Sequence, residues 1–302
     1  MIKLFTVLTL PSYKVKLIWH TFRRVILNNL NGNIQYLPSA YERCNELFEL
    51  TDQFIEYLDH LLYSDPISEP ETIINVIKLA SITRVKNLFV SINLLLRYDH
   101  WEEAKILIRS LFELLLNMEE IFRDKATVEK KAQRYLLFNE LQEYIKIRAE
   151  LNYNIMTKRV EDEDKANMAI KLMDQFAEKR FKLFLNNKKG EKFWDHYWTD
   201  DKPWKLAKKS KNRIRKQQYD ILYADMSHFV HSSPMAVLGT VNSIESVDKR
   251  VDEDNKIISE QAILAMTFTQ EILLIVGDIL PGFTGDKILE MVSKIKLFVH
   301  GE

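Results

Sequence analysis

Apolar residues recur at steps of three and four along most of the chain, which is the spacing of amphipathic α-helices. No stretch alternates convincingly like a β-strand, and residues 235–241 (MAVLGTV) form the only short β-like run. The pattern predicts helices over residues 38–63, 68–98, 99–124, 127–156, about 162–187, about 203–231, about 257–280 and about 284–299.

Capping patterns mark several of these helix starts. A side-chain oxygen followed three residues later by glutamate can satisfy the free N–H groups of a first helical turn. The candidates are Ser39 with Glu42, Ser68 with Glu71, Asp99 with Glu102, and Thr284 alone. The segment 186–192 (NNKKGEK) is one of the breaks between helices.

The chain is long and apolar enough to bury a large core, with 302 residues of which 46% are hydrophobic. Glycine and proline number seven each, which disfavours a turn-rich all-β fold. We therefore predict an all-α fold. It would comprise a single helical-bundle domain of about eight or more helices at residues 66–302, after an N-terminal helical extension at residues 1–65.

Charge, cysteine content and the length of the apolar runs indicate which surface and which compartment to expect for the protein. Lysine plus arginine and aspartate plus glutamate both number 43, so any basic surface must be local. Cys44 is the only cysteine, which excludes an internal disulfide and fits a reducing compartment. No uncharged apolar run approaches the roughly 18 residues of a spanning helix. We expect a cytoplasmic protein without a membrane partner, and the sequence leaves a homo-oligomer open.

One candidate site lies at the end of the helix predicted over residues 203–231. At about 100° per residue, Tyr223, Ser227 and His231 run along one edge of the apolar face, whereas His228 points elsewhere. His231 could act there as a general base or acid, because its pKa lies near neutrality. Alternatively, His231 only complements the dipole of a helix that Pro234 ends.

A second candidate is the polar stripe of Arg109, Glu113 and Asn117, four residues apart on a strongly apolar helix. If the stripe is covered, Arg109 could bind an anion such as phosphate, and Glu113 could orient it. The alternative is a solvated face that carries an ordinary ion pair four residues apart.

A third candidate is the tract from Lys202 to Lys216, which holds eight basic residues and no acid. Basic residues beside aromatic ones suit single-stranded nucleic acid, through phosphate contacts and base stacking. The alternative is a solvated basic face. The predicted contacts are Trp204, Lys205, Lys208, Lys209, Lys211, Arg213 and Arg215.

Other classes lack their motifs: the chain has no Walker A loop, GxGxxG, GxSxG, CxxC or HExxH. His228 and His231 have no accompanying carboxylate or cysteine cluster at a metal-ligand spacing. We therefore expect neither a metal nor a cofactor.

The motif RSLFE, followed much later by Tyr223, Ser227, His231 and Pro234, resembles a bacterial domain-of-unknown-function family, number five-six-seven-seven. The resemblance includes residues 135–146 (YLLFNELQEYIK) and the tryptophan-containing stretch, and extends over about residues 75–280. It implies that Arg109, Glu113, Tyr223, Ser227 and His231 form one polar cluster.

A looser resemblance is to the HEPN helical ribonucleases of toxin and antiphage systems. Their hallmark is arginine, four to six residues, then histidine on one helix, and this chain lacks that spacing. The resulting hypothesis is an all-α protein that acts on RNA or another phosphate-containing ligand, as a metal-independent ribonuclease-like hydrolase. There His231 would transfer the proton and Arg109 would stabilise phosphate charge. The competing hypothesis is a non-catalytic interaction module with a structural cluster.

Overall fold

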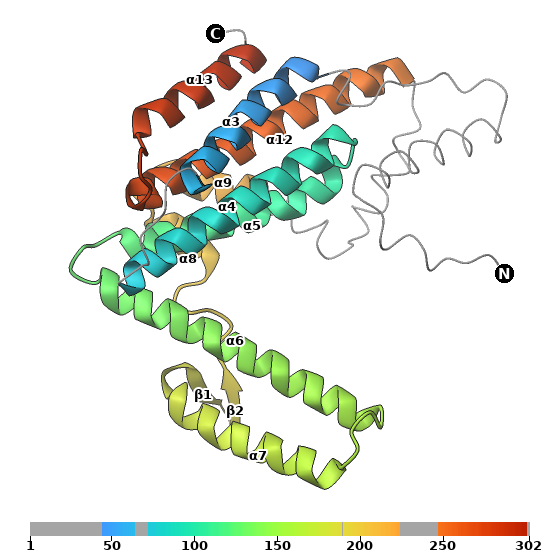
Figure 1. The fold of residues 1–302 in the computed structure, drawn as a ribbon, viewed down its shortest axis with the longest axis vertical. Coiled ribbons are helices and arrows are strands. Elements are labelled where there is room, and N and C mark those ends of the chain that lie inside the picture. Colours follow the sequence, from blue (N-terminus) through green and yellow to red (C-terminus); the bar gives the residue numbers. More distant parts are fainter. Residues whose placement is uncertain (1–43, 64–71, 189, 224–246, 301–302) are drawn as a thin grey trace, which may run out of the picture. The chain divides into compact units, whose positions relative to one another are not determined.

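The computed structural model describes residues 44–63, 72–188, 190–223 and 247–300 (Figure 1). Contacts divide the chain into residues 1–39 and residues 40–302, and every described residue lies in the second unit. The described elements are α3 (Asn45–Tyr63), α4 (Ile73–Arg97), α5 (Trp101–Phe122), α6 (Val128–Met156), α7 (Glu163–Arg180), a 3-10 helix (Lys182–Phe184), β1 (Leu185–Lys188), β2 (Glu191–Trp194), α8 (Pro203–Lys209), α9 (Arg215–Gln218), a π-helix (Tyr219–Tyr223), α12 (Val247–Val276), a second 3-10 helix (Gly277–Ile279) and α13 (Gly285–His300).

The predicted all-α class is confirmed, because the described part has nine α-helices and only two short strands. Helices α4, α5 and α12 pack on one another in the centre of the bundle, with α3 and α13 beside them (Figure 1). Ile108, Leu111, Leu115 and Met118 of α5 are fully buried. Their spacing of three and four is why the apolar stripe of α5 turns into the core.

Helix α3 packs in this core, although we assigned its residues to an N-terminal extension. Leu47, Phe48 and Phe54 are fully buried in the main hydrophobic cluster, and α3 contacts both α4 and α13. Burial of these large side chains ties α3 to the bundle.

Helices α4 and α5 begin at residues other than those expected from the capping patterns. Helix α4 is capped by Thr72, whose Oγ1 accepts a hydrogen bond from the Asn75 N–H at 3.2 Å. Asp99 is not the cap of α5: it adopts φ = 62° in the turn, and α5 begins after His100. The predicted boxes of Ser39 with Glu42 and Ser68 with Glu71 lie outside the described residues.

A β-hairpin occupies the region where we expected the end of a helix and a break. Helix α7 ends at Arg180, and β1 pairs antiparallel with β2, with Leu185 opposite Trp194. Gly190 adopts φ = 85° in the turn, a conformation that glycine accepts without strain. The hairpin, α6 and α7 share a small second core of Leu141, Ala177, Phe181 and Phe184.

The single helix predicted over residues 203–231 is wrong in its described part. Helix α8 stops at Lys209, a turn follows, and α9 and the π-helix cover only residues 215–223. The β-like run at 235–241 and the end of the predicted helix lie outside the described residues.

Two described helices are long and apolar enough to cross a membrane by length and composition, Ile73–Arg97 and Asp254–Ile279. About half of each apolar window is buried within the bundle.

Candidate functional site

Arg109 and Glu113 form the only part of the predicted cluster whose side chains lie among the described residues. The Arg109 Nε donates to Glu113 Oε1 at 3.1 Å, and the two side chains are 18% and 38% exposed. Ser227 and His231 lie outside the described residues, and for Tyr223 only the backbone is described. A joint site of Arg109 and His231 therefore stays a prediction.

The π-helix at Tyr219–Tyr223 changes the geometry on which that prediction depends. A π-turn closes its hydrogen bond over five residues rather than four, so a wheel drawn at about 100° per residue does not hold through it. Such turns are frequent at functional sites. Tyr219, at the start of the π-helix, lies close enough to Arg109, Glu113 and Tyr197 for their charges to act on it. Burial, the largest influence, raises the pKa of its phenol.

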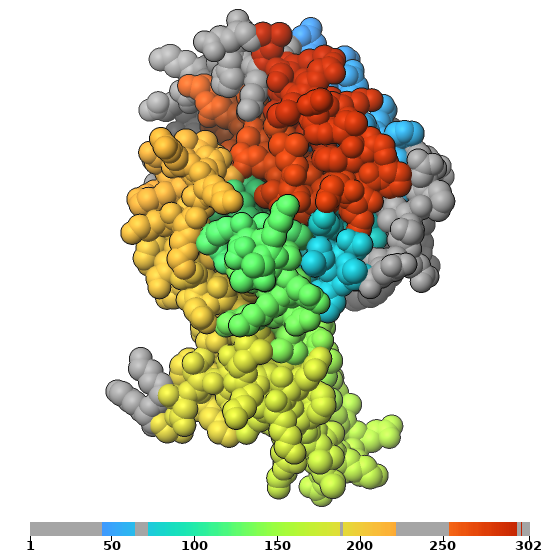
Figure 2. All heavy atoms as spheres, turned by 90° about the vertical axis from the view of Figure 1, so that its left-hand side faces the viewer, coloured from blue at the N-terminus to red at the C-terminus, as the bar shows by residue number. Residues whose placement is uncertain are grey.

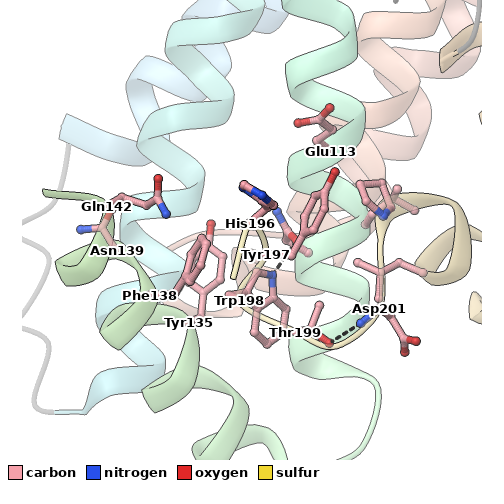
Figure 3. A pocket seen from close by; sticks show the side chains of 14 residues that line it. Glu113, Tyr135, Phe138, Asn139, Gln142, His196, Tyr197, Trp198, Thr199 and Asp201 are labelled. Atoms are coloured by element: carbon pink, nitrogen blue, oxygen red, sulfur yellow. Dashed lines mark hydrogen bonds between the residues drawn. The ribbon is translucent and has the colours of Figure 1, made fainter. Parts of the chain in front are cut away.

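A pocket of about 330 Å³ opens beside Glu113, between α5, α6 and the loop after β2 (Figure 3). Figure 3 shows the labelled side chains that line the pocket, which come from these three segments. The lining residues are Glu113, Leu116, Asn117, Tyr135, Phe138, Asn139, Gln142, His196, Tyr197, Trp198, Thr199, Asp201, Pro203 and Leu206.

Trp198 fixes the loop that forms one wall of this pocket. Its indole Nε1 donates to Asn117 Oδ1 at 2.8 Å, and its carbonyl accepts from Arg134 Nε at 2.6 Å. Its ring packs edge-on against Tyr135, with the ring centroids 5.3 Å apart. Asn117, the third residue of the predicted polar stripe, therefore holds the pocket wall in place instead of facing solvent.

The rest of the lining combines hydrogen-bonding groups with aromatic surface. Asn139 and Gln142 are exposed amides one helical turn apart on α6, and His196 and Tyr197 are exposed on the loop. Amides and imidazole both donate and accept hydrogen bonds, so this wall can bind the edge of a polar ring. We had not predicted these four residues as site residues.

Arg215 is not a nucleic-acid contact, in contrast to our prediction. Its side chain is 1% exposed, and its guanidinium donates to Glu119 Oε1 at 2.6 Å, to Gln218 Oε1 at 2.5 Å and to Glu271 Oε2. Burial alone lowers the pKa of this guanidinium, but the two carboxylates outweigh burial and raise it. Arg215 thus joins α9 to α5 and α12.

The other predicted contacts of the basic tract lie at the surface. Lys205 and Lys209 pair with the carboxylate of Asp201, at 4.0 Å in the case of Lys205. The remaining three basic contacts, Lys208, Lys211 and Arg213, are exposed and pair with no carboxylate among the described residues. Trp204 is 44% exposed on α8, whose Pro203 and Leu206 line the pocket.

Among the described residues, no group of three or more histidine, cysteine, aspartate or glutamate side chains could hold a metal ion.

The fold and pocket define an all-α protein with a polar, partly aromatic pocket beside a basic surface. Residues 76–250 match the model of the Family of unknown function (DUF5677), and the chain belongs to this family. The match contains every residue that lines the pocket. No curated protein and no solved structure matches the chain. The likeness to HEPN ribonucleases receives no support from these comparisons.

Some residues of the pocket lie in segments that had supported the family resemblance. Tyr135, Asn139 and Gln142 belong to the segment that supported the family resemblance, and Trp198 belongs to its tryptophan-containing stretch. His196 and Tyr197 stand beside those tryptophans, yet nothing in their spacing distinguished them from residues that anchor a loop.

Proposed function

We propose that this protein binds single-stranded RNA, with a base in the pocket between α5 and α6 and the phosphates along the surface after α8. The observation that carries the proposal is the position of three basic residues that pair with no carboxylate in the described part of the chain. Lys208 lies on α8, which borders the pocket, and Lys211 and Arg213 follow it directly along the chain.

The pocket has the size and chemistry for a base. Its volume lies at the lower end of the range for small-molecule sites, about 300–1,000 Å³. Proteins that bind RNA hold unstacked bases on aromatic faces and bind their edges with polar side chains. Tyr197 supplies an exposed ring, and Asn139 and Gln142 supply amides.

The charge around the pocket favours an anion although two carboxylates line it. Asp201 pairs with Lys205 and Lys209, and Glu113 pairs with Arg109, so neither carboxylate is left uncompensated. The positive charge of Lys208, Lys211 and Arg213 is then left to neutralise phosphates.

The first experiment replaces Lys208, Lys211 and Arg213 together with glutamine and measures binding of a fluorescent single-stranded RNA at several salt concentrations. We expect affinity to fall by about tenfold or more, and the slope of log affinity against log salt to lessen by about 2, since each single-strand phosphate contact contributes about 0.7. The matched control replaces the exposed Arg84, Lys125 and Lys130 with glutamine, which removes the same charges elsewhere.

The pocket is tested separately by Tyr197→Ala. Loss of one stacked base costs about 1–3 kcal/mol of binding free energy and leaves the salt slope unchanged. RNA affinity that is undetectable in the unmodified protein, or equal losses in the triple variant and its control, would overturn the proposal and favour the non-catalytic interaction module.

A further inference from the structure

The outward face of α7 carries a row of exposed apolar side chains. Met168, Leu172 and Phe176 are 65%, 57% and 65% exposed and lie four residues apart, so they form one ridge on the helix. The opposite face packs Ile170 and Ala177 toward α6. The ridge therefore contributes nothing to the described core.

None of the three side chains is covered by the described part of the chain. In the view of Figure 2, the yellow α7 region lies at the surface below the bundle. Soluble proteins rarely expose a row of large apolar side chains without a binding role. The question is which partner would cover it.

The distribution of charge along α7 indicates which partner would cover the apolar ridge. The start of α7 is acidic, with Glu161, Asp162, Glu163 and Asp164, and its end is basic, with Lys179, Arg180 and Lys182; all seven are exposed. Leu172 lies midway between the two charged ends. Asp164 and Arg180 are eight residues on either side of it, and Asp162 and Lys182 are ten.

This pattern is complementary to itself only in the antiparallel direction. A second α7 that runs the opposite way places its basic end beside the acidic end of the first, and their dipoles are then also opposed. Met168 would contact the partner's Phe176, and Leu172 would contact the partner's Leu172. Lys165 would face the partner's Lys179, but its charge is offset by Asp162 of its own helix at 2.9 Å.

We propose that two copies of this chain associate through the outward face of α7, antiparallel, about a two-fold axis at Leu172. The helix of 18 residues is about 27 Å long, so this contact alone buries less than the roughly 800 Å² per partner of a standard interface. The dimer is accordingly weak and forms with rising concentration. It is independent of RNA binding.

Charge reversal in the full chain tests the direction of pairing. One variant carries Glu161→Lys, Glu163→Lys and Asp164→Lys, which makes both ends of α7 basic. The other carries Lys179→Glu and Lys182→Glu, which makes both ends acidic. We expect each variant alone to self-associate at least about tenfold more weakly than the unmodified protein, and the mixture of the two variants to form a heterodimer. Sedimentation velocity over a range of about 1–200 μM measures the association of the unmodified protein, of each variant and of the mixture.

Cross-linking tests the position of the axis. In a Cys44→Ser background, Leu172→Cys should form a disulfide-linked dimer, because a residue at the axis lies opposite its own copy. Ile147→Cys, an exposed apolar position on α6, is the matched control. The proposal is overturned if the unmodified protein stays monomeric over the whole range, if the mixed variants do not pair, or if both cysteine variants cross-link equally.

Discussion

At the scale of single residues, the buried guanidinium of Arg215 joins three helices. It bonds to Glu119 of α5 and Glu271 of α12, and it lies 6.0 Å from the centre of the Phe112 ring. Arg215→Met would leave two partly buried carboxylates facing each other without a cation. We expect the free energy of unfolding to fall by about 3–5 kcal/mol, as measured by urea denaturation at neutral pH.

The same experiment separates lost packing from uncompensated charge. Adding Glu119→Gln and Glu271→Gln to Arg215→Met should recover part of the loss, because the carboxylates no longer repel. A loss below about 1 kcal/mol for Arg215→Met alone would contradict the assigned role, since surface substitutions stay within about 0.5 kcal/mol.

Tyr144 and Asp174 make stability depend on pH at both extremes. Burial and the hydrogen bond to Asp174 Oδ1, 2.5 Å long, raise the pKa of Tyr144 to about 12. Its contribution is therefore complete below about pH 10, the pKa in the unfolded chain, and is lost as pH rises toward about 12. The hydrogen bonds from Arg148 lower the pKa of Asp174, so its contribution is complete above about pH 4 and is lost at lower pH.

The variant Tyr144→Phe isolates the pH dependence of stability at alkaline pH. The difference in unfolding free energy between the unmodified protein and this variant should be constant from about pH 6 to 9 and should shrink above about pH 10. The difference is measured by urea titration in that range. A difference that grows above pH 10 would mean that the phenolate, and not the phenol, is favoured in the fold.

At the scale of elements, the turn between α6 and α7 holds a residue other than glycine in a left-handed conformation. Lys158 has φ = 53°, its N–H donates to the Ile155 carbonyl at 3.0 Å, and the Arg159 N–H donates to the Asn154 carbonyl at 2.8 Å. This pair of bonds is the Schellman motif, in which glycine is favoured. Lys158→Gly should raise the free energy of unfolding by about 1 kcal/mol, measured by urea denaturation.

The matched control is Lys158→Ala, which removes the same charge and keeps the Cβ strain. The alanine variant should not be stabilised. Equal gains in both variants would attribute the effect to the lost charge instead of the backbone.

The same elements show how far sequence could predict this fold. A long helix such as α5 follows directly from apolar spacing, because steps of three and four that continue over 22 residues are hard to mistake. The hairpin was missed because four-residue strands are too short for a period to show. The break after Lys209 was missed because residues 208–213 include no apolar residue, so the apolar spacing does not indicate whether a helix continues through them.

The candidate site was harder to predict than the fold. Arg109 and Glu113 were predicted because they follow one another at a step of four on the polar side of a strongly apolar helix, and the structure shows that they form an ion pair. Arg215 was misassigned because a basic neighbourhood does not reveal that two distant carboxylates, Glu119 and Glu271, meet one of its members. Such pairings over 50 to 100 residues of chain are set by helix packing, on which local spacing carries no information.

At the scale of the whole described unit, two hydrophobic cores of unequal size meet along α6. The first part of this helix packs Ala132 and Tyr135 in the large core, and Leu141 at its middle packs in the smaller core. Phe138 contacts both cores. The smaller core has four buried residues, Leu141, Ala177, Phe181 and Phe184, so much less apolar burial holds α7 and the hairpin than holds α5 and α12.

Unequal cores predict unequal local stability. In dilute protein, backbone amides of α7 and of the hairpin should exchange with deuterium at a lower opening free energy than those of α5 and α12. Phe181→Ala should speed exchange in α7 and the hairpin and leave α5 and α12 unchanged, because the lost contacts lie in the smaller core alone. Mass spectrometry of peptides from native-state exchange measures both. Exchange of all four segments at one common free energy would show instead that the two cores unfold as a unit, with Phe138 as the coupling contact.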